Sequence, residues 1–240
     1  MKMKIPDARH GSHKRWARDI FEWIIVRMMR RNFADVLMWG RSPQISPDLP
    51  ILFVANHLSW WDGFFLWRIQ RKIAPGAPVY TVMLAREFHQ TFWFKWVGML
   101  PITPGSTASL RALLKRLSAL CKQSPQAPAT VCSFFPQGVI KPSFSRPLGF
   151  ADGLGSIAQS MAPVNVVPIG IHIEPLCAKE PKAFLTVGEC FVHDTGRLNV
   201  VKVEHSLTQT LDDLLSRLAK HGEKILEEGL REGEVYVSVV

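Results

Sequence analysis

Two hydrophobic patterns follow one another along this chain. Short apolar runs bounded by proline, glycine or polar residues predict buried strands, whereas apolar residues spaced three and four apart predict amphipathic helices. Strands are predicted over residues 51–55, 78–84, 98–103, 130–135, 165–173, 184–191, 200–204 and 235–240. Helices are predicted over residues 16–33, 62–71, 107–123, 153–161 and 207–228, and residues 86–97 as an aromatic helix or a re-entrant segment. This alternation predicts an α/β fold with a mostly parallel central sheet flanked by helices.

The first predicted helix has an aromatic face with arginines crowded at both ends. Its apolar stripe contains Trp16, Ile20, Trp23, Ile24 and Met28. Such a helix suits the lipid headgroup region, and we predict that it anchors the protein to a membrane. A helix packed on the domain with a charged outer face is the alternative, because amphipathicity alone does not separate lipid from core. The chain is therefore divided into a basic amphipathic N-terminal segment, residues 1–40, and a domain of residues 41–240.

Composition narrows the classes of protein and partner. With 47% hydrophobic and 20% charged residues, the 240-residue chain is globular, and its net charge of +9 is concentrated toward the N-terminus. That basic end indicates an anionic surface, and nucleic acid is not expected as a partner because no recognised nucleic-acid module is present. The four cysteines lack C-x-x-C pairing, so we expect no metal site and a reducing compartment. Neither a signal peptide nor a transmembrane helix is predicted, and oligomeric state is left open.

The strand at residues 51–55 leads directly into Asn56 and His57, and Asp62 follows five residues after the histidine. Residues five apart on a helix differ by about 140°, so His57 can meet Asp62 only from the turn before the helix. In that position Asp62 would fix the imidazole tautomer and leave the other ring nitrogen free to take a proton from a hydroxyl. The alternative is a capping box, with Ser59 as N-cap and Asp62 at the third helical position, which requires no catalysis.

Four separated segments, in this order, resemble motifs of the glycerolipid acyltransferase superfamily, of the lysophosphatidic acid acyltransferase type. One N-H-x4-D motif is weak evidence, but four motifs in family order are specific, and together they cover roughly residues 50–175. The matching segments are Asn56-His57-Leu-Ser-Trp-Trp-Asp62, Arg86-Glu87, Phe135-Pro136-Gln137-Gly138 and Val166-Val167-Pro168-Ile169.

This resemblance implies that His57 is the general base on an acceptor hydroxyl and that Asp62 orients it. It also implies acyl-CoA or acyl-carrier protein as co-substrate, no cofactor, and a lysophospholipid or related lipid as acceptor. Membrane lipids would then be partners, and the protein would lie peripherally on the cytoplasmic face of a membrane. The substrate-binding positions implied by the motifs, together with two nearby cations, are Asn56, Arg86, Gln137, Gly138, Lys141 and Arg146.

The chain also departs from the family pattern at positions that bind phosphate. Gln137 replaces the family's glutamate, Ile140 stands where an arginine is usual, and residues 98–104 contain no arginine. Loss of both arginines removes bidentate recognition of a phosphate monoester. We therefore predict an acceptor other than lysophosphatidic acid, such as another lysolipid, a glycolipid or an aminoacyl lipid. The altered third motif leaves open a non-catalytic lipid-binding protein that keeps the same fold.

Overall fold

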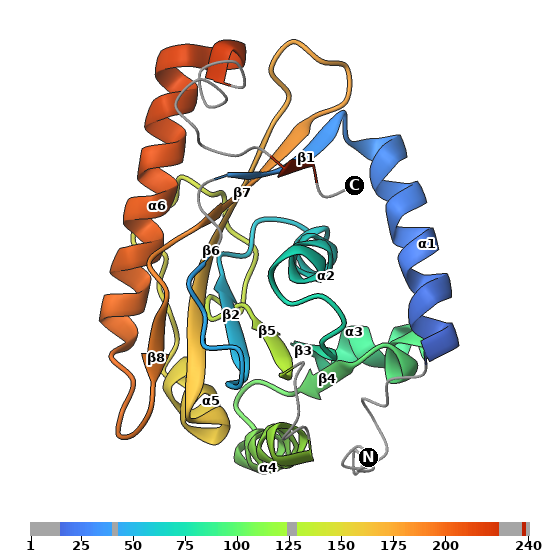
Figure 1. Ribbon diagram of the computed structural model, residues 1–240, viewed down its shortest axis with the longest axis vertical. Helices are drawn as coiled ribbons and strands as arrows, with labels where there is room; N and C mark the ends of the chain where they lie inside the picture. Colours follow the sequence, from blue (N-terminus) through green and yellow to red (C-terminus); the bar gives the residue numbers. More distant parts are fainter. Residues whose placement is uncertain (1–14, 40–42, 124–128, 226–236, 239–240) are drawn as a thin grey trace.

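A nine-stranded sheet forms the centre of the computed structural model, which describes residues 15–39, 43–123, 129–225 and 237–238 (Figure 1). The strand order is β4-β3-β5-β2-β6-β7-β1-β9, and β8 pairs with β6 off this path. The strands are β1 (Asp35–Trp39), β2 (Ile51–Ala55), β3 (Val79–Leu84), β4 (Met99–Ile102), β5 (Val131–Phe134), β6 (Val164–Glu174), β7 (Lys182–Val187), β8 (Phe191–His193) and β9 (Val237–Ser238).

Most of the strand pairs are parallel. β2 lies between β5 and β6 in parallel register, β3 pairs in parallel with β4 and β5, and β1 pairs in parallel with β7. The antiparallel pairs are β6 with β7, β6 with β8, and β1 with β9. All five residues of β2 are buried, as expected for a central strand covered on both faces. The predicted α/β fold with a mostly parallel sheet is confirmed.

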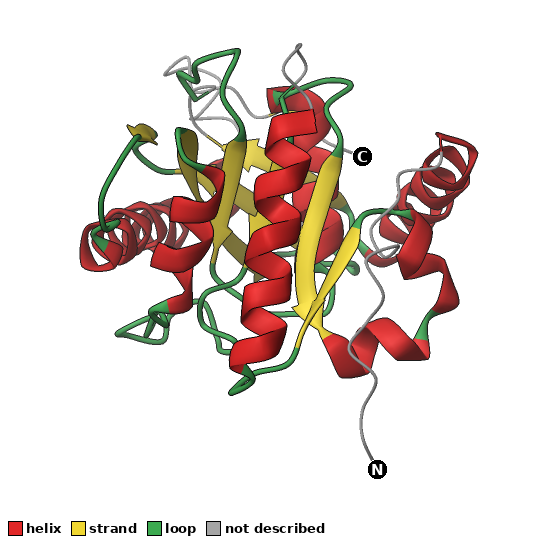
Figure 2. Cartoon of the chain, turned by 90° about the horizontal axis from the view of Figure 1, so that it is seen from below, coloured by secondary structure: helices red, strands yellow, loops and turns green. Residues whose placement is uncertain are grey.

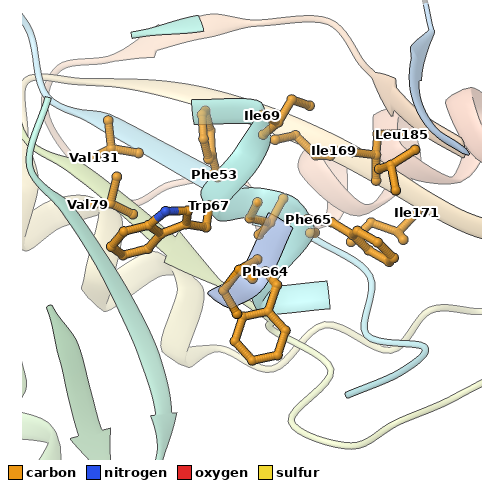
Figure 3. Close-up of a cluster of buried hydrophobic side chains, with 14 of the residues drawn as sticks. Phe53, Phe64, Phe65, Trp67, Ile69, Val79, Val131, Ile169, Ile171 and Leu185 are labelled. Atoms are coloured by element: carbon orange, nitrogen blue, oxygen red, sulfur yellow. The ribbon is translucent and has the colours of Figure 1, made fainter. Parts of the chain in front are cut away.

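Helices cover both faces of the sheet (Figures 1 and 2). Helices α1 (Arg15–Asn32) and α2 (Asp62–Ile73) share one hydrophobic cluster with Phe53 and Ala55 of β2. On the other face, Leu52 and Val54 pack with α4 (Thr107–Gln123), α5 (Gly153–Met161) and α6 (Val200–His221). Successive residues of a strand point to opposite faces, which explains this division. Figure 3 shows the first cluster, where Phe65 of α2 lies among the sheet residues.

Helix α1 is apolar on two sides. Its inner side, which includes Phe21 and Met29, is buried with α2, and the Phe21 and Trp67 rings lie 5.1 Å apart. The Glu22 carboxylate forms ion pairs with Arg68 and Arg71 of α2. The outer side of α1 carries three large apolar side chains that stay partly exposed, Trp16, Ile20 and Trp23, and the centroid of the Trp16 ring lies 5.7 Å from that of Trp96. The inner side of α1 therefore packs on the domain, as one of the two alternatives predicted. The outer side remains available to contact another surface.

The segment predicted as an aromatic helix or re-entrant stretch is divided at Thr91. Helix α3 (Ala85–Gln90) precedes this residue, and the 3-10 helix η1 (Phe92–Trp96) follows it. Within the described residues, no helix combines the length and the apolar character needed to cross a membrane.

The strand predicted over residues 200–204 is wrong, because these residues form the first turn of α6. The Asn199 side chain accepts a hydrogen bond from the Lys202 N–H at 3.0 Å and so caps the helix. Val203 then continues the buried stripe of Leu207 and Leu211. Helical spacing over this long segment outweighs the preference of valine for strands.

Other differences concern the edges of elements. The predicted strand 184–191 is two strands, β7 and β8, separated at Gly188, and β1 was not predicted. Helix α6 ends at His221 and is followed by the 3-10 helix η2 (Gly222–Lys224). The rest of the helix predicted to residue 228 lies outside the described residues, as does the N-terminal tail to residue 14.

Candidate active site

His57 lies in the turn between β2 and α2, at the carboxyl end of a central strand. Its Nδ1 atom is 2.7 Å from the Asp62 Oδ2 atom, and Asp62 is fully buried at 0% exposure. A carboxylate only accepts hydrogen bonds, so this contact places the imidazole hydrogen on Nδ1 and leaves Nε2 as an acceptor. The histidine side chain is 27% exposed, and it therefore retains access to solvent.

Asp62 also receives hydrogen bonds from the turn that precedes it. Its Oδ2 atom accepts from the N–H groups of Leu58 at 2.6 Å and Ser59 at 2.9 Å. Its Oδ1 atom accepts from the Ser59 hydroxyl at 2.7 Å, and that hydroxyl accepts from the Trp61 N–H at 3.1 Å. The helix begins at Asp62, as predicted, with Trp61 as its N-cap, so the alternative that placed Ser59 at the N-cap does not hold in that form. The two alternatives for Asp62 nevertheless coexist, because one carboxylate holds the helix start and the imidazole together.

The main chain of His57 is held by the loop that follows β5. Its N–H donates to Gln137 Oε1 at 2.6 Å, and its carbonyl accepts from the Lys141 N–H at 2.8 Å. The imidazole stacks on the Phe135 ring, with centroids 4.7 Å apart and an interplanar angle of 27°. β2 and β5 are neighbouring parallel strands, so their carboxyl ends bring the first and third motifs together.

Gln137 lies behind the histidine with 8% of its surface exposed. Its Oε1 atom faces the His57 N–H, and its Nε2 atom donates to the Leu148 carbonyl at 3.1 Å. The amide accepts through its oxygen from the His57 N–H and donates through its nitrogen to the Leu148 carbonyl. A glutamate carboxylate cannot donate, so one of its oxygens would face the Leu148 carbonyl oxygen without a hydrogen between them. Glutamine in place of the family's glutamate therefore has a local structural reason. Both polar atoms of the Gln137 side chain are hydrogen-bonded.

Asn56 and Gly138, which the resemblance implies as substrate-binding, take structural positions. The Asn56 side chain is 1% exposed, donates to the Ile171 carbonyl at 2.9 Å and accepts from the Ile171 N–H at 2.7 Å. This contact ties the end of β2 to β6. Gly138 has a φ angle of 65°, a conformation that favours glycine, and its N–H donates to the Phe135 carbonyl at 3.2 Å. It forms the turn that sends the loop back toward His57.

The three candidate cations differ in what surrounds them. Arg86, 76% exposed at its side chain, pairs with neighbouring Glu87 at 3.0 Å just after the carboxyl end of β3. Lys141 Nζ donates to the Leu148 carbonyl at 3.3 Å. Arg146 donates to the Ser143 carbonyl at 2.7 Å and to Asp212 Oδ1 of α6 at 3.0 Å. Arg146 therefore holds the loop on α6, and its guanidinium is engaged by Asp212 and by loop carbonyls.

A hydrogen-bonded chain that the motifs did not indicate joins the loop after β5 to the end of β6. Ser143 Oγ is 2.7 Å from His172 Nδ1, and His172 Nε2 is 3.3 Å from Glu174 Oε2. Ser143 and His172 are both buried, and burial lowers the pKa of His172 against an opposing effect from Glu174. The chain fixes the loop after β5 to the end of β6. Since Ser143 lies 29 residues before His172, only their packing reveals the contact.

The sequence matches a family model, and the structure resembles that of a known enzyme. A family model described as Acyltransferase matches residues 41–172, more than half of the chain. The chain belongs to the acyltransferase family. The crystal structure of the 1-acyl-sn-glycerophosphate (LPA) acyltransferase PlsC from Thermotoga maritima has the same fold, with a TM-score of 0.56 and 20% identity over 82% of this chain and 78% of that one. No curated protein matches.

The matched region includes His57, Asp62, Gln137 and the loop after β5. The resemblance to acyltransferases noted from four motifs is therefore confirmed at the level of the family. Among the described residues, no group of three or more His, Cys, Asp or Glu side chains could hold a metal ion.

Proposed function

We propose that this acyltransferase moves a fatty acyl group from acyl-CoA or acyl-carrier protein to a hydroxyl of a lysophospholipid or related lipid. His57 is the general base, and Asp62 orients it. The observation that carries the proposal is the 2.7 Å contact between His57 Nδ1 and the buried Asp62 carboxylate, which leaves Nε2 available to an acceptor hydroxyl. Membership of the acyltransferase family and the fold shared with a PlsC enzyme support the reaction class.

The reaction then needs one proton transfer in each direction. His57 Nε2 takes the proton of the acceptor hydroxyl while its oxygen attacks the thioester carbonyl. The carbon–sulfur bond breaks, the new ester remains on the acceptor, and the imidazolium returns the proton to the departing thiolate. Asp62 stabilises the imidazolium between these steps, because its carboxylate faces Nδ1. Assistance of this kind contributes about 10²–10⁴ in rate.

The second part of the proposal is peripheral attachment to the cytoplasmic face of a membrane. The outer side of α1 supports it, since Trp16, Ile20 and Trp23 are 51%, 43% and 65% exposed. Arginines follow them near the end of the helix, and Arg27 lies 5.9 Å from the Trp23 ring centroid. Exposed aromatic residues beside arginines suit the interface between lipid chains and anionic headgroups. All four cysteines are free, which suits a reducing compartment.

The proposed acceptor carries no phosphate monoester. Recognition of that group favours an arginine fork, and the nearby Arg146 is engaged with Asp212 and the loop carbonyls. Lys141, whose main chain contacts His57, offers a single ammonium that already donates to the Leu148 carbonyl. An acceptor with an uncharged or zwitterionic headgroup fits these surroundings better than lysophosphatidic acid does.

Acyl transfer by the purified protein tests the catalytic part. Wild type and His57→Ala are incubated with a long-chain acyl-CoA or acyl-carrier protein and a panel of lysolipids, and the products are measured by mass spectrometry. We expect product with wild type and at least a hundredfold less with His57→Ala. Equal product from the two proteins would reject the proposed base. A wild type that transfers from neither donor would favour a non-catalytic lipid-binding protein, and strong preference for lysophosphatidic acid would reject the proposed acceptor.

Vesicle sedimentation tests the attachment separately. The triple variant Trp16→Ser/Ile20→Ser/Trp23→Ser removes the outer apolar side of α1 and leaves its buried side intact. Val201→Ser is the matched control, because this side chain is 76% exposed on α6, at the opposite face of the sheet. We expect the triple variant to lose binding to anionic vesicles and the control to keep it. Undiminished binding by the triple variant would exclude α1 as the anchor.

A further inference from the structure

Four large apolar side chains are exposed on the two segments that meet at His57, namely residues 56–61 and residues 137–145. Trp60 is 60% exposed, Val139 55%, Ile140 59% and Phe144 71%. Soluble proteins normally keep such groups scattered, and an exposed apolar cluster beside a functional site indicates a surface that binds something apolar. These four side chains are called the catalytic rim.

The hydrogen bonds around His57 explain why the rim is assembled there. Gln137 binds the His57 N–H and Lys141 binds its carbonyl, so the short stretch containing Val139 and Ile140 is attached to the histidine at both of its ends. Trp60 is in the same turn as His57, between β2 and α2. The rim residues therefore belong to the two segments that hold and contain His57.

Phe144 is held outward by its neighbour. Residues 142–145 form a turn closed by the Ser145 N–H and the Pro142 carbonyl at 3.0 Å. Ser143, inside this turn, is buried with its hydroxyl 2.7 Å from His172 Nδ1. Because Ser143 is anchored inward, the adjacent Phe144 is left in solvent, where a soluble chain gains nothing from placing a phenyl ring.

We propose that the catalytic rim inserts into the surface of a lipid bilayer and seats the mouth of the active site on it. This rests on the proposed function, since a lipid acceptor dissolved in a bilayer must present its hydroxyl to His57. The surface is distinct from the outer side of α1, so the protein contacts lipid at two places. A lipid reactant then reaches the base without crossing water.

Charge and packing favour lipid over another occupant. The rim itself has no charged member, Lys141 adjoins Ile140, and Arg86 is exposed after the carboxyl end of β3. Apolar side chains bordered by cations match the layered polarity of an anionic bilayer surface. Trp60 also contacts Phe64, with ring centroids 4.6 Å apart, and Phe64 lies 6.0 Å from Phe21 of α1. A row of aromatic rings thus links Trp60 to the buried side of α1, the helix whose outer side is the proposed anchor.

The test compares two variants that each remove exposed apolar groups. The rim variant is Val139→Ser/Phe144→Ser, and the matched control is Val192→Ser/Val201→Ser, whose valines are 47% and 76% exposed away from the site. Binding to vesicles of phosphatidylcholine with phosphatidylglycerol is measured by sedimentation. Acyl transfer is measured with the acceptor in the same vesicles and, separately, with a monomeric short-chain acceptor and a short-chain acyl thioester.

We expect the rim variant to lose about tenfold or more in vesicle binding and in transfer to the vesicle-borne acceptor. Transfer between the two monomeric substrates should remain within about twofold of wild type, and the control should behave as wild type in every assay.

Equal loss with monomeric substrates would overturn the proposal, because the rim would then be part of the substrate site. Unchanged vesicle binding and transfer would also overturn it. A wild-type dimer that the rim variant loses, seen by analytical ultracentrifugation, would assign the rim to a second copy of the chain. Loss of transfer only when acyl-carrier protein is the donor would assign it to that protein. Failure of the proposed function is recognised separately, as wild type that transfers no acyl group in either format.

Discussion

The substitution Asp62→Asn separates the orientation of His57 from the start of α2. Asparagine has the shape of aspartate and is itself favoured at helix starts. With its oxygen in the place of Oδ2, it still accepts from His57 Nδ1 and from the N–H groups of Leu58 and Ser59. Its amide nitrogen, in the place of Oδ1, donates to the Ser59 hydroxyl, which has a second lone pair for the Trp61 N–H. What disappears is the negative charge.

The structure gives the size of the two effects. Since all four partners of Asp62 keep a hydrogen bond, the free energy of unfolding should fall by only about 1–3 kcal/mol, the difference between charged and neutral acceptors. Asp62→Ala would instead leave two buried N–H groups without an acceptor, at about 1–3 kcal/mol for each group. The imidazolium, however, loses its counter-charge with either change. We expect kcat for Asp62→Asn to fall at least about a hundredfold, equivalent to about 2.7 kcal/mol of activation free energy.

The assay follows release of free thiol from acyl-CoA at saturating acceptor, with urea unfolding measured on the same samples. Ser59→Ala is the matched control, because it removes the hydroxyl that supports the turn and keeps the carboxylate on His57. It should lose about 1 kcal/mol of stability and little of kcat. If Asp62→Asn keeps kcat within about threefold of wild type, the carboxylate serves the helix start alone, and its proposed role toward His57 is refuted.

Three further predictions concern stability and reactivity. Gly170→Ala places a Cβ atom 2.9 Å from Leu211 Cδ2, so we expect a loss of about 1–3 kcal/mol in urea unfolding, and an unchanged midpoint would contradict this close approach of α6 to β6. Burial lowers the pKa of His172 from 6.5, so below that pH the unfolded chain binds a proton that the folded chain does not. The free energy of unfolding should therefore fall as the pH drops below 6.5, and His172→Gln should remove this part of its pH dependence. The Cys190 thiol is partly buried, and burial raises its pKa to about 11, whereas Cys177 is exposed, with a pKa raised by its hydrogen bond with Glu223; iodoacetamide at pH 8 should therefore reach Cys177 before Cys190, as peptide mass mapping would show.

Periodicity predicted the elements that lie wholly within one pattern. The leucine stripe of residues 107–123 and the apolar spacing of residues 153–161 gave α4 and α5 with the bounds that the structure has. Both helices cover a sheet face with a single apolar side, which is the arrangement that helical spacing encodes. The central strands were predicted to within one residue at each end for the same reason, since strands buried on both faces are continuous apolar runs.

Elements that depend on distant partners were predicted less well. β1 pairs with β7, which follows it by more than half of the chain, and nothing local distinguishes its few residues from the end of a helix. Residues 200–204 contain three valines, but the Asn199 cap and the leucines that follow make them helical. In both cases tertiary packing determined a state that local preference left undecided or opposed.

The same distinction holds within the site. Spacing left the approach of His57 to Asp62 as one of two alternatives, and the motif resemblance favoured it; the structure has the contact, because both residues belong to one turn. The partners of Gln137 and Arg146 were not, since Leu148 and Asp212 reach them only when the loop folds back on β6 and α6. A motif therefore identifies which residues gather near the base, whereas the direction of each side chain follows from contacts outside the motif.

The attachment of the His57 main chain at both N–H and carbonyl has a consequence for engineering. Gln137 and Lys141 supply these two bonds from a loop that begins at a different strand. Replacing this loop with that of a relative would thus also remove part of the support of the proposed base. Grafts that exchange residues 56–62 and 135–148 together should retain turnover where exchange of the loop alone loses it.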